Sequence, residues 1–127
     1  MKIAVTIARI LLGLLFTVFG LNGFLHFIPM QPPTGLAGQY MGALFLSHYL
    51  VPIFLLQLTG GLLLLVNRFV PLGLLLLGPV LVNILLFHAC MAPAGLPMAL
   101  FATLLWFVVF AGVRQAFAGV FVQRVEA

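Results

Sequence analysis

Side chains able to do chemistry are few in this chain, and its three histidines all stand at the ends of long apolar runs. His26 closes the first run, His48 opens the second and His88 closes the third. A polar side chain inside a membrane is costly and needs a partner or a function. If successive runs cross a membrane, these three run ends lie on the same side of it. We therefore expect the imidazoles to share one end of the protein.

Carboxamides accompany the histidines and extend the candidate site. Asn22 precedes His26 by four positions, Asn83 precedes His88 by five, and Gln57 lies midway along the second run. Residues four apart share a helix face. Neutral imidazoles and carboxamides both donate and accept hydrogen bonds, so these five side chains suit a pocket for a quinone or another carbonyl-bearing lipid. In the alternative interpretation they only join neighbouring helices, each bond contributing about 1 kcal/mol.

Sulfur-containing residues near the same end allow a third interpretation, a metal site. Cys90, Met91 and Met41 could join the histidines as soft ligands for copper or zinc. The histidines lie in three different runs and form no HxxxH pair, and no acidic side chain is near to orient a ligating imidazole. The spacing therefore favours neither a metal nor a haem. His48 and the single cysteine, Cys90, are secondary candidates for the ligand site.

Composition excludes a water-soluble protein. Of the 127 residues, 65% are hydrophobic and 5% are charged, and the mean hydropathy is +1.38, whereas about a quarter of the residues in a soluble domain carry charge. The sequence predicts an all-α integral membrane protein that forms one transmembrane domain over residues 1–127. The five basic residues do not cluster, so we expect no nucleic acid partner. The expected partners are membrane lipids and either another protein or a second copy of the chain.

Four apolar runs are long enough for membrane-spanning helices, each of which needs about 20 residues. They cover residues of about 3–27, 49–66, 69–91 and 97–117. The outer loop 28–48 opens with prolines, which cannot continue a helix. Within it, residues 36–46 are too few to span and predict a short amphipathic helix at the membrane interface.

Basic residues set the expected orientation, because cytoplasmic loops are enriched in lysine and arginine. The outer loop 28–48 and the connection 92–95 contain neither. Both termini are therefore expected in the cytoplasm and the histidines at the outer face. Arg9, slightly inside the first run, is expected to extend toward the cytoplasmic interface. As a secondary candidate, it could instead bind a lipid phosphate or a partner helix. The remaining basic residues are Lys2, Arg68, Arg114 and Arg124.

Small and aromatic residues predict how the helices pack. Gly13, Thr17 and Gly20 form a stripe on the first helix where a neighbour can approach closely. Pro79 is expected to kink the third helix. Trp106 lies mid-membrane, so its indole N–H is expected to bond Gln57 or a carbonyl. The similar Asn and His spacing in the first and third runs also suggests two related helical hairpins.

Four segments carry a resemblance to a known family. ARILLGLLF (8–16), FGLNGFLHF (19–27), GGLLLLVNRFVPL (60–72) and PVLVNILLFH (79–88) resemble the DoxX-like family of small four-helix membrane proteins. The resemblance implies a compact bundle in the bacterial inner membrane. It also implies a link to oxidoreductase complexes, since the family takes its name from a subunit of a thiosulfate:quinone oxidoreductase. Other members are similar to cargo receptors or assembly factors. Many relatives have lysine near the end of the first helix, where this chain has Asn22 and His26, and no catalytic residue is carried over.

Two functions follow as expectations. The first is a redox-associated subunit whose outer pocket binds a quinone or similar lipid. The second is a non-catalytic scaffold or assembly factor whose asparagines and histidines only hold helices together. The absence of carboxylates and dithiols within the runs argues against an enzyme that acts alone.

Overall fold

Every regular element in the computed structural model, which describes residues 1–29 and 32–125, is helical. The prediction of an all-α protein is therefore confirmed. A short helix separates the first and second long helices, and 3-10 turns flank the last one. The elements are α1 (Lys2–Leu25), α2 (Gly35–Leu46), α3 (Leu50–Leu65), α4 (Val70–Cys90), η1 (Pro93–Gly95), α5 (Leu96–Val113) and η2 (Arg114–Phe121).

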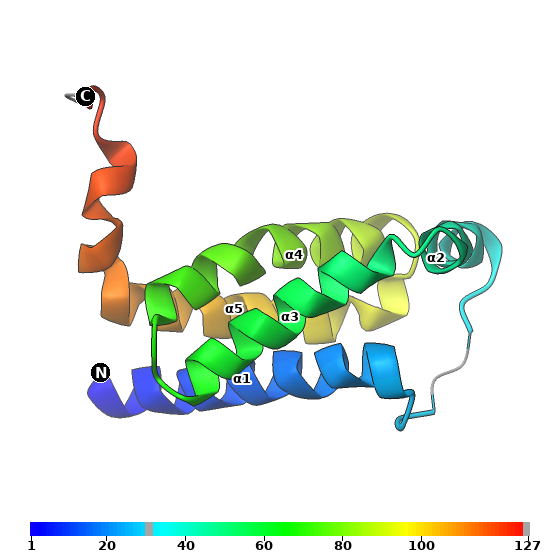
Figure 1. Ribbon diagram of the computed structural model, residues 1–127, viewed down its shortest axis with the longest axis horizontal. Coiled ribbons are helices and arrows are strands. Elements are labelled where there is room, and N and C mark those ends of the chain that lie inside the picture. Colours follow the sequence, from blue (N-terminus) through cyan, green and yellow to red (C-terminus); the bar gives the residue numbers. More distant parts are fainter. Residues whose placement is uncertain (30–31, 126–127) are drawn as a thin grey trace.

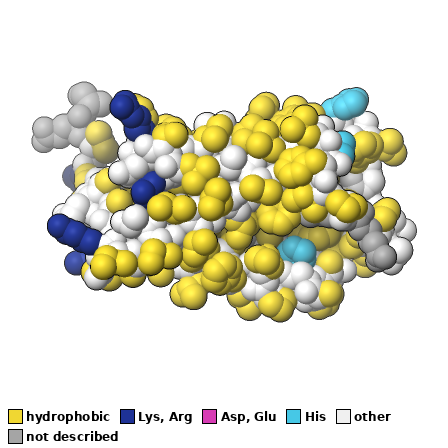
Figure 2. All heavy atoms as spheres, turned by 90° about the horizontal axis from the view of Figure 1, so that it is seen from below, with side chains coloured by type: hydrophobic (Ala, Val, Ile, Leu, Met, Phe, Trp, Pro, Cys, Tyr) yellow, Lys and Arg dark blue, Asp and Glu magenta, His cyan; other side chains and the backbone are white. Residues whose placement is uncertain are grey.

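The four long helices run side by side (Figure 1). α1 packs against α3 and α5, and α4 packs against the same two helices, so the four form a closed ring. The N-terminal end of α1 and the turns of η2 lie at one end of this ring, and α2 lies at the other (Figure 1). Figure 2 shows the lysine and arginine side chains gathered toward the first end and histidine side chains toward the second. The chain therefore has one basic end and one end that carries the candidate site.

Among the described residues, three helical segments are long and apolar enough to cross a membrane: α1, α4, and α5 with its flanking turns. A fourth span exists if α2 and α3 count as one broken segment, because an 88° bend separates them. α3 alone has 16 residues, or about 24 Å at 1.5 Å per residue, which is less than the hydrocarbon thickness of about 30 Å. The apolar helices support the membrane prediction.

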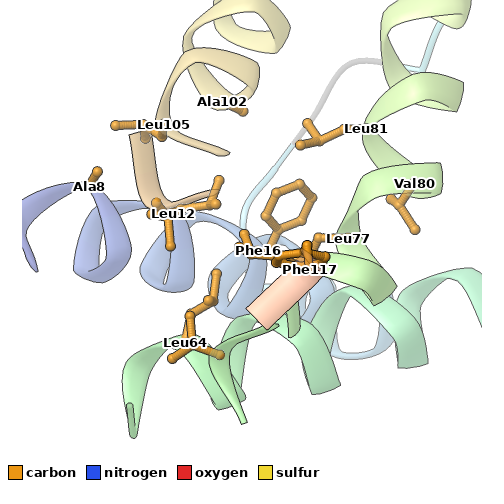
Figure 3. Packing of buried hydrophobic residues seen from close by; sticks show 13 residues of the cluster. Ala8, Leu12, Phe16, Leu64, Leu77, Val80, Leu81, Ala102, Leu105 and Phe117 are labelled. Carbon is orange, nitrogen blue, oxygen red and sulfur yellow. The ribbon is translucent and has the colours of Figure 1, made fainter. Parts of the chain in front are cut away.

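The core lies between the four helices, and much of the outside is as apolar as the core. Figure 3 shows Leu12 and Phe16 of α1 among side chains from the other long helices, and both are fully buried. Leu14, Leu75 and Phe107 point outward and are about half exposed. A helix that is apolar on all sides belongs in a core or a membrane, so the exposed faces suit lipid.

Glycines set the distance between α1 and α3, as the small-residue stripe predicts. A Cβ atom on Gly13 would lie 3.0 Å from the carbonyl oxygen of Gly61, and one on Gly61 would lie 2.7 Å from the backbone nitrogen of Thr17. A Cβ atom on Gly20 would lie 3.0 Å from the backbone nitrogen of Leu58. The two backbones approach so closely that a larger residue at Gly61 would force them apart, and one at Gly13 or Gly20 would require neighbouring atoms to shift.

Three other expectations about local structure have mixed outcomes. The indole N–H of Trp106 donates to the Leu74 carbonyl at 3.0 Å, which is the carbonyl alternative and joins α5 to α4. The short helix expected in the outer loop is present as α2. Its own apolar side chains are spread over all of its faces, so it is not amphipathic. The last run was expected to remain helical to residue 117, whereas the α-helix ends at Val113 and continues as 3-10 turns.

Candidate ligand-binding site

Two of the three histidines occupy chain reversals. His26 has φ of 52° and ends α1, where its N–H donates to the Asn22 carbonyl at 2.9 Å. His48 has φ of 63° and lies between α2 and α3. Positive φ is uncommon for residues other than glycine, although histidine is one of the enriched types. These two histidines therefore also form the chain reversals at the ends of their runs, which their spacing in the sequence did not reveal.

His26 and His48 both line a cavity at this end, which we call the large cavity. Its volume is about 540 Å³, within the range of small-molecule sites. Asn22 is its third side chain able to form strong hydrogen bonds, and Phe24 and Phe54 meet edge to face in its wall with ring centres 6.1 Å apart. The remaining lining residues are Phe19, Gly23, Ile28, Pro29, Phe45, Leu50 and Val51.

The two polar atoms of the Asn22 side chain have different roles. The residue is 8% exposed, and its Oδ1 accepts a hydrogen bond of 2.7 Å from the backbone N–H of Ile28. This bond holds the segment that leaves α1. Within residues 1–29 and 32–125, the amide Nδ2 has no hydrogen-bond partner. It is therefore a donor available to a ligand.

Gln57, Asn83 and His88 line a different space, which we call the small cavity. It lies between α2, α3 and α4 and has a volume of about 90 Å³. The single pocket expected for all five candidates is thus divided into two. The reason is that α3 packs between α1 and α4 and presents Phe54 to the large cavity and Gln57 to the small one.

Aromatic contacts shape the small cavity. The Tyr40 ring of α2 stacks on Phe87 of α4 with ring centres 5.6 Å apart, and the Tyr40 hydroxyl donates to Asn83 Oδ1 at 3.4 Å. These contacts dock α2 against α4. Asn83 is exposed, unlike the buried Asn22, so the two Asn and His pairs that suggested related hairpins have different local environments.

His88 has a fixed ring. Its Nδ1 lies 3.1 Å from the Ala92 carbonyl, and because a carbonyl only accepts, Nδ1 carries the proton and Nε2 is left as an acceptor. A Cβ atom on Gly95 would overlap the imidazole. Glycine at the start of the last helical segment therefore makes room for the ring.

Gln57 is buried without a partner. It is 8% exposed, and none of the side-chain hydrogen bonds among the described residues involves its carboxamide. Its polar atoms are not fully enclosed, because the only buried side-chain atom without a partner in the described ranges is Thr17 Oγ1. The Gln57 carboxamide is thus accessible from the small cavity.

Arg9 and Cys90 lie outside both cavities. Arg9 donates to the carbonyls of Leu64 and, at 3.4 Å, Leu65. These carbonyls end α3 at the basic end of the molecule, and the Leu64 carbonyl also accepts a bond from the Asn67 N–H at 3.3 Å. Cys90 is an exposed free thiol at the end of α4. The part of the chain that the structure describes contains no group of three histidine, cysteine or acidic side chains placed to hold a metal, so the metal interpretation has no geometric support.

A third cavity, about 350 Å³ in volume, is almost wholly apolar. It lies between α1, α4 and α5, with Phe16, Ala99 and Ala102 in its walls and His88 as its one strongly polar residue. Such a groove suits a hydrocarbon chain.

Sequence reasoning missed the walls of these cavities. The chain has 13 phenylalanines, so nothing marked Phe54 or Phe87 as facing a cavity. Tyr40 could have been found, because it is a hydrogen-bonding residue in an otherwise apolar segment.

Comparison of the chain with protein-family models, curated proteins and solved structures gave no match. The functional argument therefore depends on the residues and on the geometry described above.

Proposed function

We propose that this protein is a DoxX-like, multi-pass protein of the bacterial inner membrane that binds a quinone or similar ring-bearing lipid in the large cavity. In this proposal the four long helices form a transmembrane bundle, with both termini and the basic end in the cytoplasm. The location of basic residues supports this orientation. The cavities then open near the outer leaflet, where α2 lies along the interface.

One observation carries the proposal: the large cavity combines a few hydrogen-bonding groups with aromatic walls. The Asn22 amide and the imidazoles of His26 and His48 stand among phenylalanine rings. Quinone carbonyls accept hydrogen bonds, and aromatic walls favour a planar ring through offset or edge contacts. No charged side chain lines the cavity among the described residues, which favours a neutral ligand.

The proposed role is that of a redox-associated subunit. His26 and His48 are exposed at the cavity rim, and an imidazole both donates and accepts hydrogen bonds. The histidines would thus pass protons between the outer water and the oxygens of the bound ring. Electrons would come from a partner oxidoreductase, which is the class of protein partner that the family resemblance implies.

Glycine substitutions at both histidines test this function. Glycine suits the positive φ values, so His26→Gly with His48→Gly removes both imidazoles and keeps the chain reversals. The probe is decylubiquinone, titrated calorimetrically into the purified protein in detergent. Each lost neutral hydrogen bond is worth about 0.5–1.5 kcal/mol, so the double variant is expected to bind roughly tenfold more weakly.

The matched control is Asn67→Gly. Asn67 also has positive φ, at 56°, but it lies in the turn between α3 and α4 at the basic end. The Asn67→Gly variant is expected to bind decylubiquinone with the same affinity as the wild type. The quinone function is rejected if the wild type shows no saturable binding, or if the double variant binds as tightly as the control.

A scaffold function is the second candidate, because two polar bonds hold chain segments together. They join Asn22 to Ile28 and Tyr40 to Asn83. In that case Tyr40→Phe and Asn83→Ala lower the free energy of unfolding and no quinone signal is found. Cross-linking from the outer loop would then recover a protein partner.

A further inference from the structure

We propose that the small cavity is a second binding site, specific for a small neutral phenol-type ring, with the Gln57 carboxamide as its main polar contact. This proposal does not depend on a quinone in the large cavity. It rests on a buried polar side chain that the fold leaves without a partner.

Gln57 has no structural use that the geometry reveals. Its side chain is 8% exposed, and the described residues offer its carboxamide no hydrogen bond. The indole of Trp106, a partner expected from the sequence, bonds the Leu74 carbonyl instead. A leucine at this position would bury apolar surface without an unsatisfied group. A ligand that bonds the carboxamide would explain why a glutamine is there.

The other polar groups of the cavity define the ligand's chemistry. Asn83 uses its Oδ1 for Tyr40, which leaves its amide as a donor. His88 uses its Nδ1 for Ala92, which leaves Nε2 as an acceptor. Gln57 offers one group of each kind. No charged side chain of the described residues lines the cavity, so the ligand is neutral, and a hydroxyl, which both donates and accepts, complements this set.

The size and the walls favour an aromatic hydroxyl. The volume is about 90 Å³, whereas a cavity for one water needs only about 10–15 Å³, so a molecule larger than water fits. Tyr40 and Phe87 present stacked rings to the cavity, and aromatic pairs gain from offset or edge contacts. A phenol-type ring meets all of these conditions, whereas an aliphatic alcohol lacks the ring contacts.

Two probes that differ only by the hydroxyl isolate its contribution: 4-propylphenol and propylbenzene. Each is titrated into detergent-solubilised protein labelled with ¹⁵N in the glutamine side-chain amides, and the Gln57 signal is assigned by its loss in Gln57→Leu. We expect 4-propylphenol to shift this signal saturably and propylbenzene to bind at least tenfold more weakly.

Variants complete the test, with binding followed calorimetrically. Gln57→Leu is expected to weaken 4-propylphenol binding at least tenfold and to raise the melting temperature of the unliganded protein. The control is Gln39→Leu, at an exposed position of α2, which is expected to change neither. The double glycine variant of the large cavity should still bind 4-propylphenol, so failure of the quinone function and failure of this proposal are distinguishable.

Four results would overturn the second site. Equal affinity for the two probes would show apolar filling only. Equal affinity of Gln57→Leu and wild type for 4-propylphenol would place binding elsewhere. A lower melting temperature for unliganded Gln57→Leu, or water cross-peaks to the Gln57 amide without a saturable shift, would assign the carboxamide to structure or to a water-filled space.

Discussion

Replacement of Gly61 by alanine is expected to force α1 and α3 apart. The added Cβ atom would lie 2.7 Å from the backbone nitrogen of Thr17, 2.8 Å from Thr17 Oγ1 and 3.0 Å from the Gly13 carbonyl oxygen. Favourable contacts begin near 3.5 Å, so the backbones must separate by roughly 0.8 Å. Two of the three obstructing atoms are backbone atoms, which cannot rotate away. Over-packing of this kind costs about 1–3 kcal/mol.

The separation should also be measurable at the large cavity, because α1 and α3 form its walls. Phe24 of α1 and Phe54 of α3 are in edge contact there. If the helices separate, these rings part and the cavity widens. We therefore expect Gly61→Ala to weaken decylubiquinone binding severalfold in addition to lowering stability.

The assay is unfolding in mixed micelles by increasing sodium dodecyl sulfate, followed by circular dichroism. Gly42→Ala is the matched control, because a Cβ atom there meets nothing within 4 Å and the position is helical. The control is expected to be neutral or to gain up to about 1 kcal/mol from helix propensity. If Gly61→Ala is as stable as the control, the close approach of α1 and α3 is refuted.

Two further substitutions test local features. His26→Gly should raise the free energy of unfolding by about 1 kcal/mol, because φ of 52° strains an L-residue but not glycine. A free energy of unfolding below that of the wild type in the same micelle titration would contradict the left-handed conformation at the end of α1. Trp106→Phe should lower the free energy of unfolding by about 0.5–1.5 kcal/mol, because the 3.0 Å bond to Leu74 is lost. Decylubiquinone affinity should not change, because Trp106 lines neither the large nor the small cavity. Unchanged stability would argue against this bond.

The candidate site shows how far the sequence could be interpreted. Its polar residues were identified because such residues are rare in this chain. Six histidine or carboxamide side chains line the large and small cavities. Five of these residues were primary candidates from the sequence. They are Asn22, His26, Gln57, Asn83 and His88, with His48 as the sixth. Their division between two cavities could not be predicted, because helices that are apolar on all sides carry no periodicity that reveals their rotation.

Local backbone conformation was equally out of reach. The sequence places His26 at the end of an apolar run, but its left-handed conformation depends on the bond from Ile28 to buried Asn22. Arg9 was expected to extend toward the interface at the basic end, but the sequence did not reveal that it would bond the Leu64 carbonyl there, 55 positions away. Both outcomes depend on which groups the folded chain brings within reach.

The sequence by itself determined that the chain is helical and apolar on its outside, and that small residues line one face of its first helix. These properties follow from composition and local spacing, which act within a few residues. Only the tertiary structure decided that α3 separates Phe54 from Gln57, that α2 closes the small cavity through Tyr40, and that Gln57 is left without a partner. Those features depend on non-local packing, in which the rotation of each helix is fixed by close contacts such as that of Gly61 with Thr17.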